Sequence, residues 1–297
     1  ADNDNYQVKN DAVLSKDGKI LLFYIAGSDK TDYTVSEEVE TIYSYAFSGA
    51  HKLESVVISD NVKSLSEGLF YNCSKLDTVT LPETTELIPY SMFENCYKLT
   101  TVENAGGVTV IEGRAFKGCA VLQVAPITDK VTEIGENAFE GCSSIKEVKI
   151  PSTITEIKKA SFKDCTSLEK VEFNDEITII EDSAFYNCSK LGGYKLPAKL
   201  KTIGQFAFAS TCTDKELYAD KVALDAEGNE IVDEEGKKVM EKVIKITLII
   251  PDGVTEIGFR AFYTSLYIDE IYIPESVIVI ADGAVDVSAN TSIYSKS

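Results

Sequence analysis

The chain has 297 residues, of which 44% are hydrophobic and 26% charged, a composition typical of a folded protein rather than a disordered one. Its 48 acidic and 29 basic residues give a formal net charge of −19, which repels phosphate backbones and anionic lipid surfaces, so we expect no nucleic-acid partner. No run approaches the roughly 20 apolar residues of a membrane-spanning helix, so we also expect no membrane insertion.

Residues 1–35 differ from the rest of the chain. They open on the polar run ADNDNYQ without an initiator Met, which resembles a chain whose targeting segment has been either cleaved or trimmed. Export is therefore compatible with the sequence, although no export signal is present in it. Residues 13–25 then place Asp17 and Gly18 between two apolar runs, which is typical of a β-hairpin. We therefore predict that residues 1–35 form an N-terminal hairpin cap.

Residues 36–288 repeat with a period of 23 residues. A phenylalanine marks each unit: Phe47, Phe70, Phe93, Phe116, Phe139, Phe162, Phe185 and Phe208. The next, Phe262, follows after 54 residues, and Val285 takes the position 23 residues later. Apolar residues recur eight and five positions before each Phe and six and nine positions after it, so the unit reads V-x-x-I-x-x-x-A-F-x-x-C-x-x-L-x-x-V-x-I-P. Such a sustained period predicts a solenoid of about ten to eleven coils.

Each unit carries the signals for one strand and one turn of helix. The stretch L-x-x-V-x-I ends in alternating β-branched residues and is often followed by Pro, which predicts a short strand. We expect a single helical turn, 3₁₀ or α, around the Ala-Phe pair. A residue that tolerates left-handed backbone geometry would close it: Gly49, Asn72, Asn95, Gly118, Gly141 or Asn187. Coils stacked at roughly 4.8 Å would pair their strands into a parallel sheet over a continuous core.

Two neighbouring coils depart from the unit. One carries Met92 and Asn104, and the next has Ala125 and Pro126 where a Val and a polar residue are expected. These departures from the unit predict a local distortion of the sheet there.

One later coil carries a 31-residue insertion, at about residues 213–245. Its turns, DAEGNE and DEEGKK, separate short apolar runs, which predicts a projecting hairpin or small meander. Such a loop is either a binding element or tolerated decoration. The turns lack the D-x-[DN]-x-[DN]-G pattern of a calcium loop. Beyond Val285 the chain turns polar, and residues 289–297 are expected to form a C-terminal tail.

Six of the seven cysteines occupy one position, three residues after the Phe: Cys73, Cys96, Cys119, Cys142, Cys165 and Cys188. Equivalent residues of stacked coils have parallel Cα–Cβ vectors, which is poor geometry for disulfides, and thiolates in one column do not converge on a metal. We therefore expect a structural cysteine ladder of small buried thiols. Cys212 stands outside it, and its reactivity stays open.

The unit, for example IGENAFEGCSSIKEVKIP at Ile134–Pro151, resembles the BspA-like leucine-rich repeat family of bacterial surface and secreted proteins. The resemblance implies an α/β fold class: a right-handed leucine-rich-repeat solenoid whose coils each hold one short parallel strand and one short helical turn, capped at both ends. It also implies secretion or display at the cell surface of a bacterium, and adhesion to host matrix proteins such as fibronectin and fibrinogen. The family fixes no binding residues by a motif.

Candidate partner-binding residues lie ten positions after the Phe, where strand side chains point outward. They are Val57, Thr80, Glu103, Lys149, Glu172, Lys195 and Tyr272. Lys149, Glu172 and Lys195 alternate in sign, which indicates a cross-strand charge ladder or else a polar recognition strip. Tyr272 is the better contact candidate, because aromatic side chains dominate protein-binding hot spots.

The sequence does not predict an enzyme. Its one histidine, His51, cannot form a His cluster, and there is no G-x-S-x-G, Walker or dinucleotide-binding pattern. We expect no cofactor and no metal site. We expect instead a monomeric, adhesin-like extracellular module that binds a protein or glycan ligand, with host extracellular matrix among the candidates. The alternative is a structural spacer that presents another domain at the cell surface.

Overall fold

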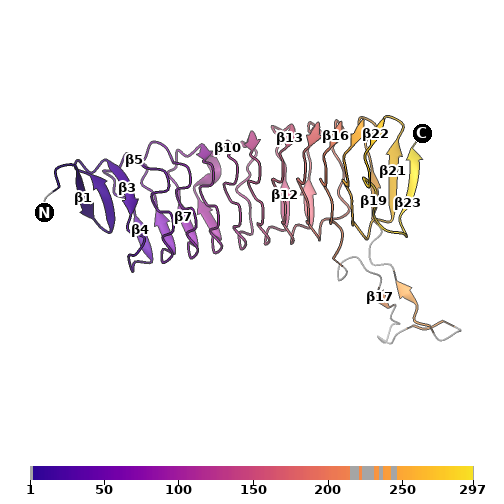
Figure 1. The fold of residues 1–297 in the computed structure, drawn as a ribbon, viewed down its shortest axis with the longest axis horizontal. Coiled ribbons are helices and arrows are strands. Elements are labelled where there is room, and N and C mark those ends of the chain that lie inside the picture. Colours follow the sequence, from indigo (N-terminus) through magenta and orange to yellow (C-terminus); the bar gives the residue numbers. More distant parts are fainter. Residues whose placement is uncertain (1–2, 215–220, 223–230, 234–236, 242–245, 297) are drawn as a thin grey trace.

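The computed structural model describes residues 3–214, 221–222, 231–233, 237–241 and 246–296. The chain winds into an elongated solenoid of coils of about 23 residues, with its two ends at opposite ends of the long axis (Figure 1). The predicted solenoid is therefore confirmed. Each regular coil contributes one strand to each of two parallel rows and a third, strandless side that carries the Ala-Phe pair.

The strands predicted from L-x-x-V-x-I form the first row, which we call the long-strand row. Its members are β4 (Asp32–Thr34), β6 (Ser55–Val57), β7 (Thr78–Thr80), β9 (Thr101–Glu103), β12 (Glu147–Lys149), β14 (Lys170–Glu172), β19 (Thr247–Ile249), β21 (Glu270–Pro274) and β23 (Ser292–Lys296). They pair in parallel within three sheets, ordered β4-β6-β7-β9, β12-β14 and β19-β21-β23. In β12, Val148 is buried between exposed neighbours, which is the alternation expected of a strand with one face on the core.

A second row of two- to five-residue strands runs along the opposite side of each coil. It comprises β3 (Ile20–Tyr24), β5 (Thr41–Ile42), β8 (Leu87–Ile88), β10 (Val110–Ile111), β11 (Glu133–Ile134), β13 (Glu156–Ile157), β15 (Ile179–Ile180), β16 (Thr202–Ile203), β20 (Glu256–Ile257) and β22 (Val279–Ile280). These strands also pair in parallel, and the pairing of β16 with β20 passes across the insertion. The apolar residue five positions before the Phe is the inward side chain of this row.

The prediction of a helical turn at each Ala-Phe pair is wrong. The α/β class, which included that turn, is therefore wrong as well. The one helix in the described part of the chain is the 3₁₀ turn η1 (Ala105–Gly107), which lies elsewhere in its coil. The residue two positions after the Phe is left-handed as predicted, with φ between 56° and 79°. The residue two positions before the Phe is left-handed as well, with φ between 52° and 65° in ten coils. Two left-handed residues four positions apart interrupt any right-handed helix.

This alternating backbone sends every second N–H to the neighbouring coil. The N–H groups of Asn137, Phe139 and Gly141 donate to carbonyls of the following coil at 3.0, 2.8 and 2.8 Å. The N–H groups of the residues between them, Ala138 and Glu140, donate three residues back at 3.3 and 3.1 Å. The strandless side is therefore a third backbone ladder between coils, and it uses the hydrogen bonds that a helix would have kept within one coil.

The core is a single stack of phenylalanine rings along the solenoid axis. Successive rings from Phe47 to Phe262 are stacked with centroids 5.2–5.6 Å apart, and all nine are fully buried. The stack crosses the insertion without a break, since Phe208 and Phe262 are 5.5 Å apart. Burial of each ring contributes about 1.5–3 kcal/mol, and the buried Val, Ile and Leu side chains of the same coil contribute similar amounts.

The N-terminal end is closed by an antiparallel hairpin. Strand β1 (Tyr6–Lys9) pairs with β2 (Ala12–Ser15), and β2 pairs with β3 around the turn at Asp17 and Gly18. Strand β3 then joins the first coil in parallel through β5. Tyr24 stacks on Phe47 at 5.5 Å, so an aromatic ring of the cap continues the phenylalanine stack.

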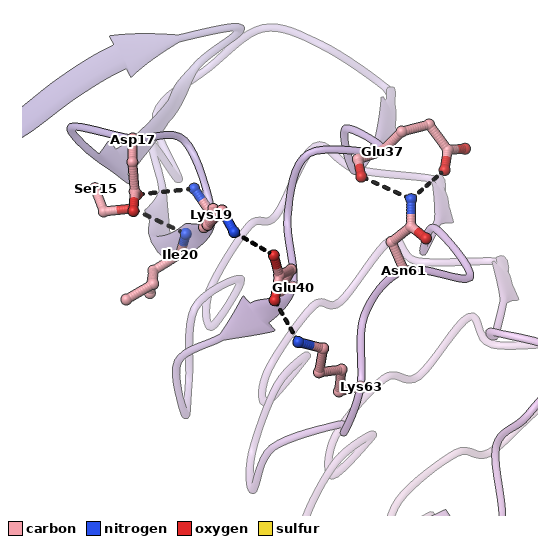
Figure 2. A network of polar contacts seen from close by, with 8 residues as sticks. All are labelled: Ser15, Asp17, Lys19, Ile20, Glu37, Glu40, Asn61 and Lys63. Atoms are coloured by element: carbon pink, nitrogen blue, oxygen red, sulfur yellow. Dashed lines mark hydrogen bonds and ion pairs between the residues drawn. The ribbon is translucent and has the colours of Figure 1, made fainter.

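A chain of polar contacts ties this cap to the first two coils, as Figure 2 shows. Asp17 accepts a hydrogen bond from the Lys19 N–H at 3.1 Å, and the Lys19 ammonium pairs with Glu40 at 2.7 Å. Glu40 also pairs with Lys63 of the next coil. The two ammonium groups lower the pKa of Glu40 from 4.5 to about 2, chiefly through the hydrogen bond from Lys19.

The C-terminal end is built differently. Residues 292–296, expected as part of a polar tail, form β23 and extend the sheet by pairing with β21. Ile280 occupies the inward position of the second row, yet it is 49% exposed, whereas Ile257 one coil earlier is fully buried. The last coil therefore leaves apolar surface uncovered.

The insertion projects sideways from the solenoid near β19 (Figure 1). Strand β17 (Lys221–Val222) pairs antiparallel with β18 (Met240–Glu241), and Val232 bridges Lys238. These pairs have the antiparallel register of a hairpin. The DAEGNE turn and residues 234–236 of DEEGKK lie outside the described residues. No helix in the described part of the chain is long and apolar enough to span a membrane.

Ser161 offers a test of how strictly the strandless side selects its residues. It is fully buried at the position before Phe162, where most coils have Ala, and its hydroxyl has no hydrogen-bond partner in the structure. We expect Ser161→Ala to raise the free energy of unfolding by about 1 kcal/mol, because it removes an unsatisfied buried hydroxyl. The converse change one coil earlier, Ala138→Ser, should lower it by about 1–3 kcal/mol. Denaturant midpoints of the three proteins would check both, and a destabilised Ser161→Ala variant would contradict the prediction.

Glu40 predicts part of the acid sensitivity. Its folded pKa of about 2 lies below its ordinary value of 4.5, so its stabilising contribution is present above pH 4.5 and is lost as the pH falls toward 2. The Tm difference between the wild-type protein and Glu40→Gln should therefore shrink over that range. Lys63→Met should move this change to higher pH, because one of the two cations is gone. Thermal melts between pH 2 and 7 would test this, and a pH-independent difference would refute it.

Candidate interaction surface

The outward side chains of the long-strand row lie along one side of the solenoid, which we call the long-strand face. All seven sequence-predicted candidates belong to it: Val57, Thr80, Glu103, Lys149, Glu172, Lys195 and Tyr272. Six lie in strands, and Lys195 lies in a coil where the strand is not formed. This face is not uniform, because its three sheets are separated by two interruptions.

In the first sheet the register places Val57, Thr80 and Glu103 side by side. The Thr80 hydroxyl donates to the Glu103 carboxylate at 2.6 Å, and Val57 is 42% exposed. This part of the face therefore presents a small apolar and polar surface with its hydrogen bonds already formed.

In the second sheet Lys149 and Glu172 are paired in register, but their charges are satisfied elsewhere. The Lys149 ammonium pairs with Asp129 at 3.3 Å. Glu172 pairs with Lys170 of its own strand, which lowers the pKa of Glu172. The expected cross-strand charge ladder is therefore replaced by contacts within a strand and to a neighbouring turn.

In the third sheet Tyr272 has an aromatic partner that the sequence did not reveal. Its ring stacks on Tyr294 of β23 with centroids 4.8 Å apart and an interplanar angle of 18°. Tyr294 is 42% exposed. The sequence did not predict β23, because the last unit has no Phe to mark it and residues 289–297 were expected to form a tail. The Tyr272–Tyr294 pair was therefore not predicted either.

The first interruption lies between β9 and β12, at residues 123–127, where a distortion was predicted. Figure 1 shows the row of arrows break before β12. Pro126 stands at a central ladder position and has no N–H to donate. The Ile127 N–H turns back to Ala125 at 2.8 Å, whereas the equivalent N–H of Ile150 donates to Glu172 of the next coil at 2.9 Å. The segment has therefore left the sheet, and Val124 is 76% exposed.

This interruption opens a groove of about 750 Å³ on the long-strand face. It is lined by Gln123, Val124, Ala125 and Ile127 of the displaced segment and by residues of β12, β14 and the turns that precede these strands. Three lysines and three glutamates are among the lining residues: Lys146, Lys149, Lys170, Glu147, Glu169 and Glu172. The groove is thus locally neutral in a chain whose net charge is −19. Its apolar portion is Val124, Ala125, Ile127 and Val148.

The second interruption, at residues 192–196, opens no comparable space. Tyr194 turns inward and stacks on Phe208 at 4.7 Å, so its ring fills the place that the strand vacates. The cavity beside it measures only about 10 Å³. Of the two interruptions, the first is the one that offers a ligand site of ordinary size.

The repeat unit also matches a known sequence family. Six copies of the BspA type Leucine rich repeat region match residues 23–134, 109–222 and 237–296. The chain belongs to the BspA-type leucine-rich repeat family. No curated protein matches the chain in sequence.

Solved structures similar to this BspA-type chain are bacterial leucine-rich repeat proteins. One from Bacteroides ovatus has a TM-score of 0.73 at 21% identity, with 100% of this chain and 76% of that one covered. A leucine-rich cell surface protein from Faecalibacterium prausnitzii has a TM-score of 0.53 at 24% identity, covering 100% and 77%. A leucine-rich repeat protein from T. pallidum has a TM-score of 0.53 at 20% identity, covering 64% and 90%. These likenesses show the shared fold.

The cysteine column of this BspA-type repeat lies in the core. All six thiols are buried and free, and each donates to the carbonyl of the Phe one coil earlier, at 3.0–3.3 Å. Ser265 takes over this role beyond the insertion, since its hydroxyl donates to the Phe208 carbonyl at 2.9 Å. The column therefore selects a small side chain that can donate a hydrogen bond. Among the described residues no three His, Cys, Asp or Glu side chains cluster as metal ligands would.

The buried thiols are expected to be unreactive in the native protein. Burial raises the pKa of Cys73 to about 12 and raises those of the other five thiols of the column as well. Since the thiolate is the reactive form, an aromatic disulfide reagent at pH 8 should label none of these six in the native protein. All seven should react in guanidinium chloride. Rapid labelling of several thiols without denaturant would contradict this assignment.

Proposed function

We propose that the chain is a surface or secreted interaction module of a bacterium that binds a protein partner through the groove beside residues 123–127 on the long-strand face. The observation that carries the proposal is the neutral, partly apolar groove at residues 123–127 on this face. We propose a binding role and no catalytic one.

Several features favour a protein partner. A site of about 750 Å³ with charged residues of both signs suits a polypeptide better than a polyanion, which would need an excess of lysine or arginine. The Tyr272–Tyr294 pair adds exposed aromatic surface to the same face. The Faecalibacterium structure is described as a cell surface protein, which supports an extracellular location for this chain.

A spacer role is the second candidate. The two ends of the described chain lie at opposite ends of the long axis (Figure 1), so the solenoid would hold two attached regions apart. A spacer does not require an open groove, and for that reason we favour binding.

The test is saturable binding of immobilised host matrix proteins, fibronectin and fibrinogen first, measured by biolayer interferometry. We expect Lys149→Glu with Lys170→Glu to weaken binding about tenfold or more, because both lysines line the groove. A chain lacking residues 213–245 should bind as the intact chain does. Binding by neither matrix protein, or loss of binding only on that deletion, would refute the proposed surface.

A further inference from the structure

We propose that the groove takes an extended polypeptide segment, which pairs as an added β-strand with the open edge of β12. This inference rests on the proposed binding role and specifies the ligand and its mode of binding. The occupant is one short stretch of a partner protein in extended conformation.

Strand β12 has an unpaired edge that faces the interruption. Strand β12 pairs with β14 on one side and with no strand on the other, and β9, across the same interruption, likewise has only β7 beside it. Among the described residues no backbone hydrogen bond joins residues 123–127 to Glu147–Lys149. An edge strand in this state presents alternating N–H and C=O groups, which are the groups that an added strand uses.

Residues 123–127 of the chain do not supply a strand at this edge. In the regular coils the N–H at the position of Ile127 donates to the next coil, but the Ile127 N–H is already bonded to Ala125, and Pro126 has no N–H with which to hold the segment against the previous coil. The displaced segment instead forms the far wall of the groove, where Val124 is 76% exposed. The β12 edge therefore remains available to another chain while the groove keeps its walls.

The residues that line the groove indicate the chemistry of the occupant. Side chains of a strand alternate between two sides, and the groove offers apolar contacts at Val124 and Ile127 and charges of both signs along β12 and β14. Three lysines balanced by three glutamates do not concentrate positive charge for a sulfated glycan. A segment that alternates apolar residues with residues of mixed charge is complementary to both features.

The decisive variant restores the missing strand. Val124→Glu, Ala125→Val and Pro126→Lys together give residues 124–126 the sequence E-V-K, which Glu147–Lys149 have at the same position of the following coil. We expect this variant to fold with a Tm at least equal to that of the wild-type protein, because it regains ladder hydrogen bonds. It should lose peptide binding, because its new strand occupies the β12 edge.

The probe is a phage-displayed library of random dodecapeptides, selected on the wild-type chain. Synthetic copies of enriched peptides are then measured by fluorescence anisotropy against the wild-type chain, the strand-restored variant, Lys149→Glu and Lys195→Glu. The last two are a matched pair, since both lysines occupy the same position of the repeat but only Lys149 lines the groove. We expect about tenfold weaker binding for Lys149→Glu and none for the strand-restored variant, with Lys195→Glu unchanged.

Backbone N-methylation of the peptide tests the strand pairing directly. Methylation at alternate residues removes the N–H groups of one edge, so one of the two alternate sets should abolish binding and the other should leave it intact. Equal tolerance of both sets would overturn the added-strand mode.

Unchanged binding to the strand-restored variant, or no enrichment over that variant, would overturn the site. If matrix proteins nevertheless bind the strand-restored variant as tightly as the wild-type chain, this inference fails while the wider binding role stands. Binding of a sulfated glycan in place of any peptide would also overturn it.

Discussion

Successive coils must be separated by nearly the same distance on all of their sides, and the rest of the structure depends on this constraint. Phenylalanine rings stacked 5.2–5.6 Å apart set this spacing in the core, and three backbone ladders maintain it at the periphery. Because the coils are in register, every residue lies above and below its equivalents one repeat away. A side chain is therefore selected by the column that it joins as much as by its own coil.

The cysteine column and Ser161 illustrate that selection from opposite directions. A Phe carbonyl in one coil offers an acceptor to the column three residues after the next Phe, and Cys or Ser supplies the donor. The position before the Phe offers Ser161 no partner, so its hydroxyl is buried without a hydrogen bond. Buried polar groups in this fold are thus favourable or costly according to whether the adjacent coil supplies their complement.

The same regularity explains why departures from it concentrate the functional candidates. A regular coil pairs its strand on both sides and leaves only outward side chains to a partner. At residues 192–196 the missing strand is compensated by Tyr194, whose ring packs on Phe208. At residues 123–127 nothing fills the space, and a groove and an open strand edge result. Of the two interruptions, only the first therefore leaves a space of ligand size.

The sequence by itself determined the period, the inward columns, the long strands and the family, because a 23-residue repeat constrains all coils together. It also located the distortion at Pro126, since proline cannot join a ladder. It did not determine the Ala-Phe conformation: Tyr45, Arg114 and Ala160 are ordinary residues at a left-handed position, held there by hydrogen bonds to the next coil. Only the tertiary structure decided that the distortion opens a groove, that Lys149 pairs with Asp129 and that Tyr294 joins Tyr272. These contacts depend on how displaced and terminal segments settle against neighbouring coils, which a repeat pattern does not encode.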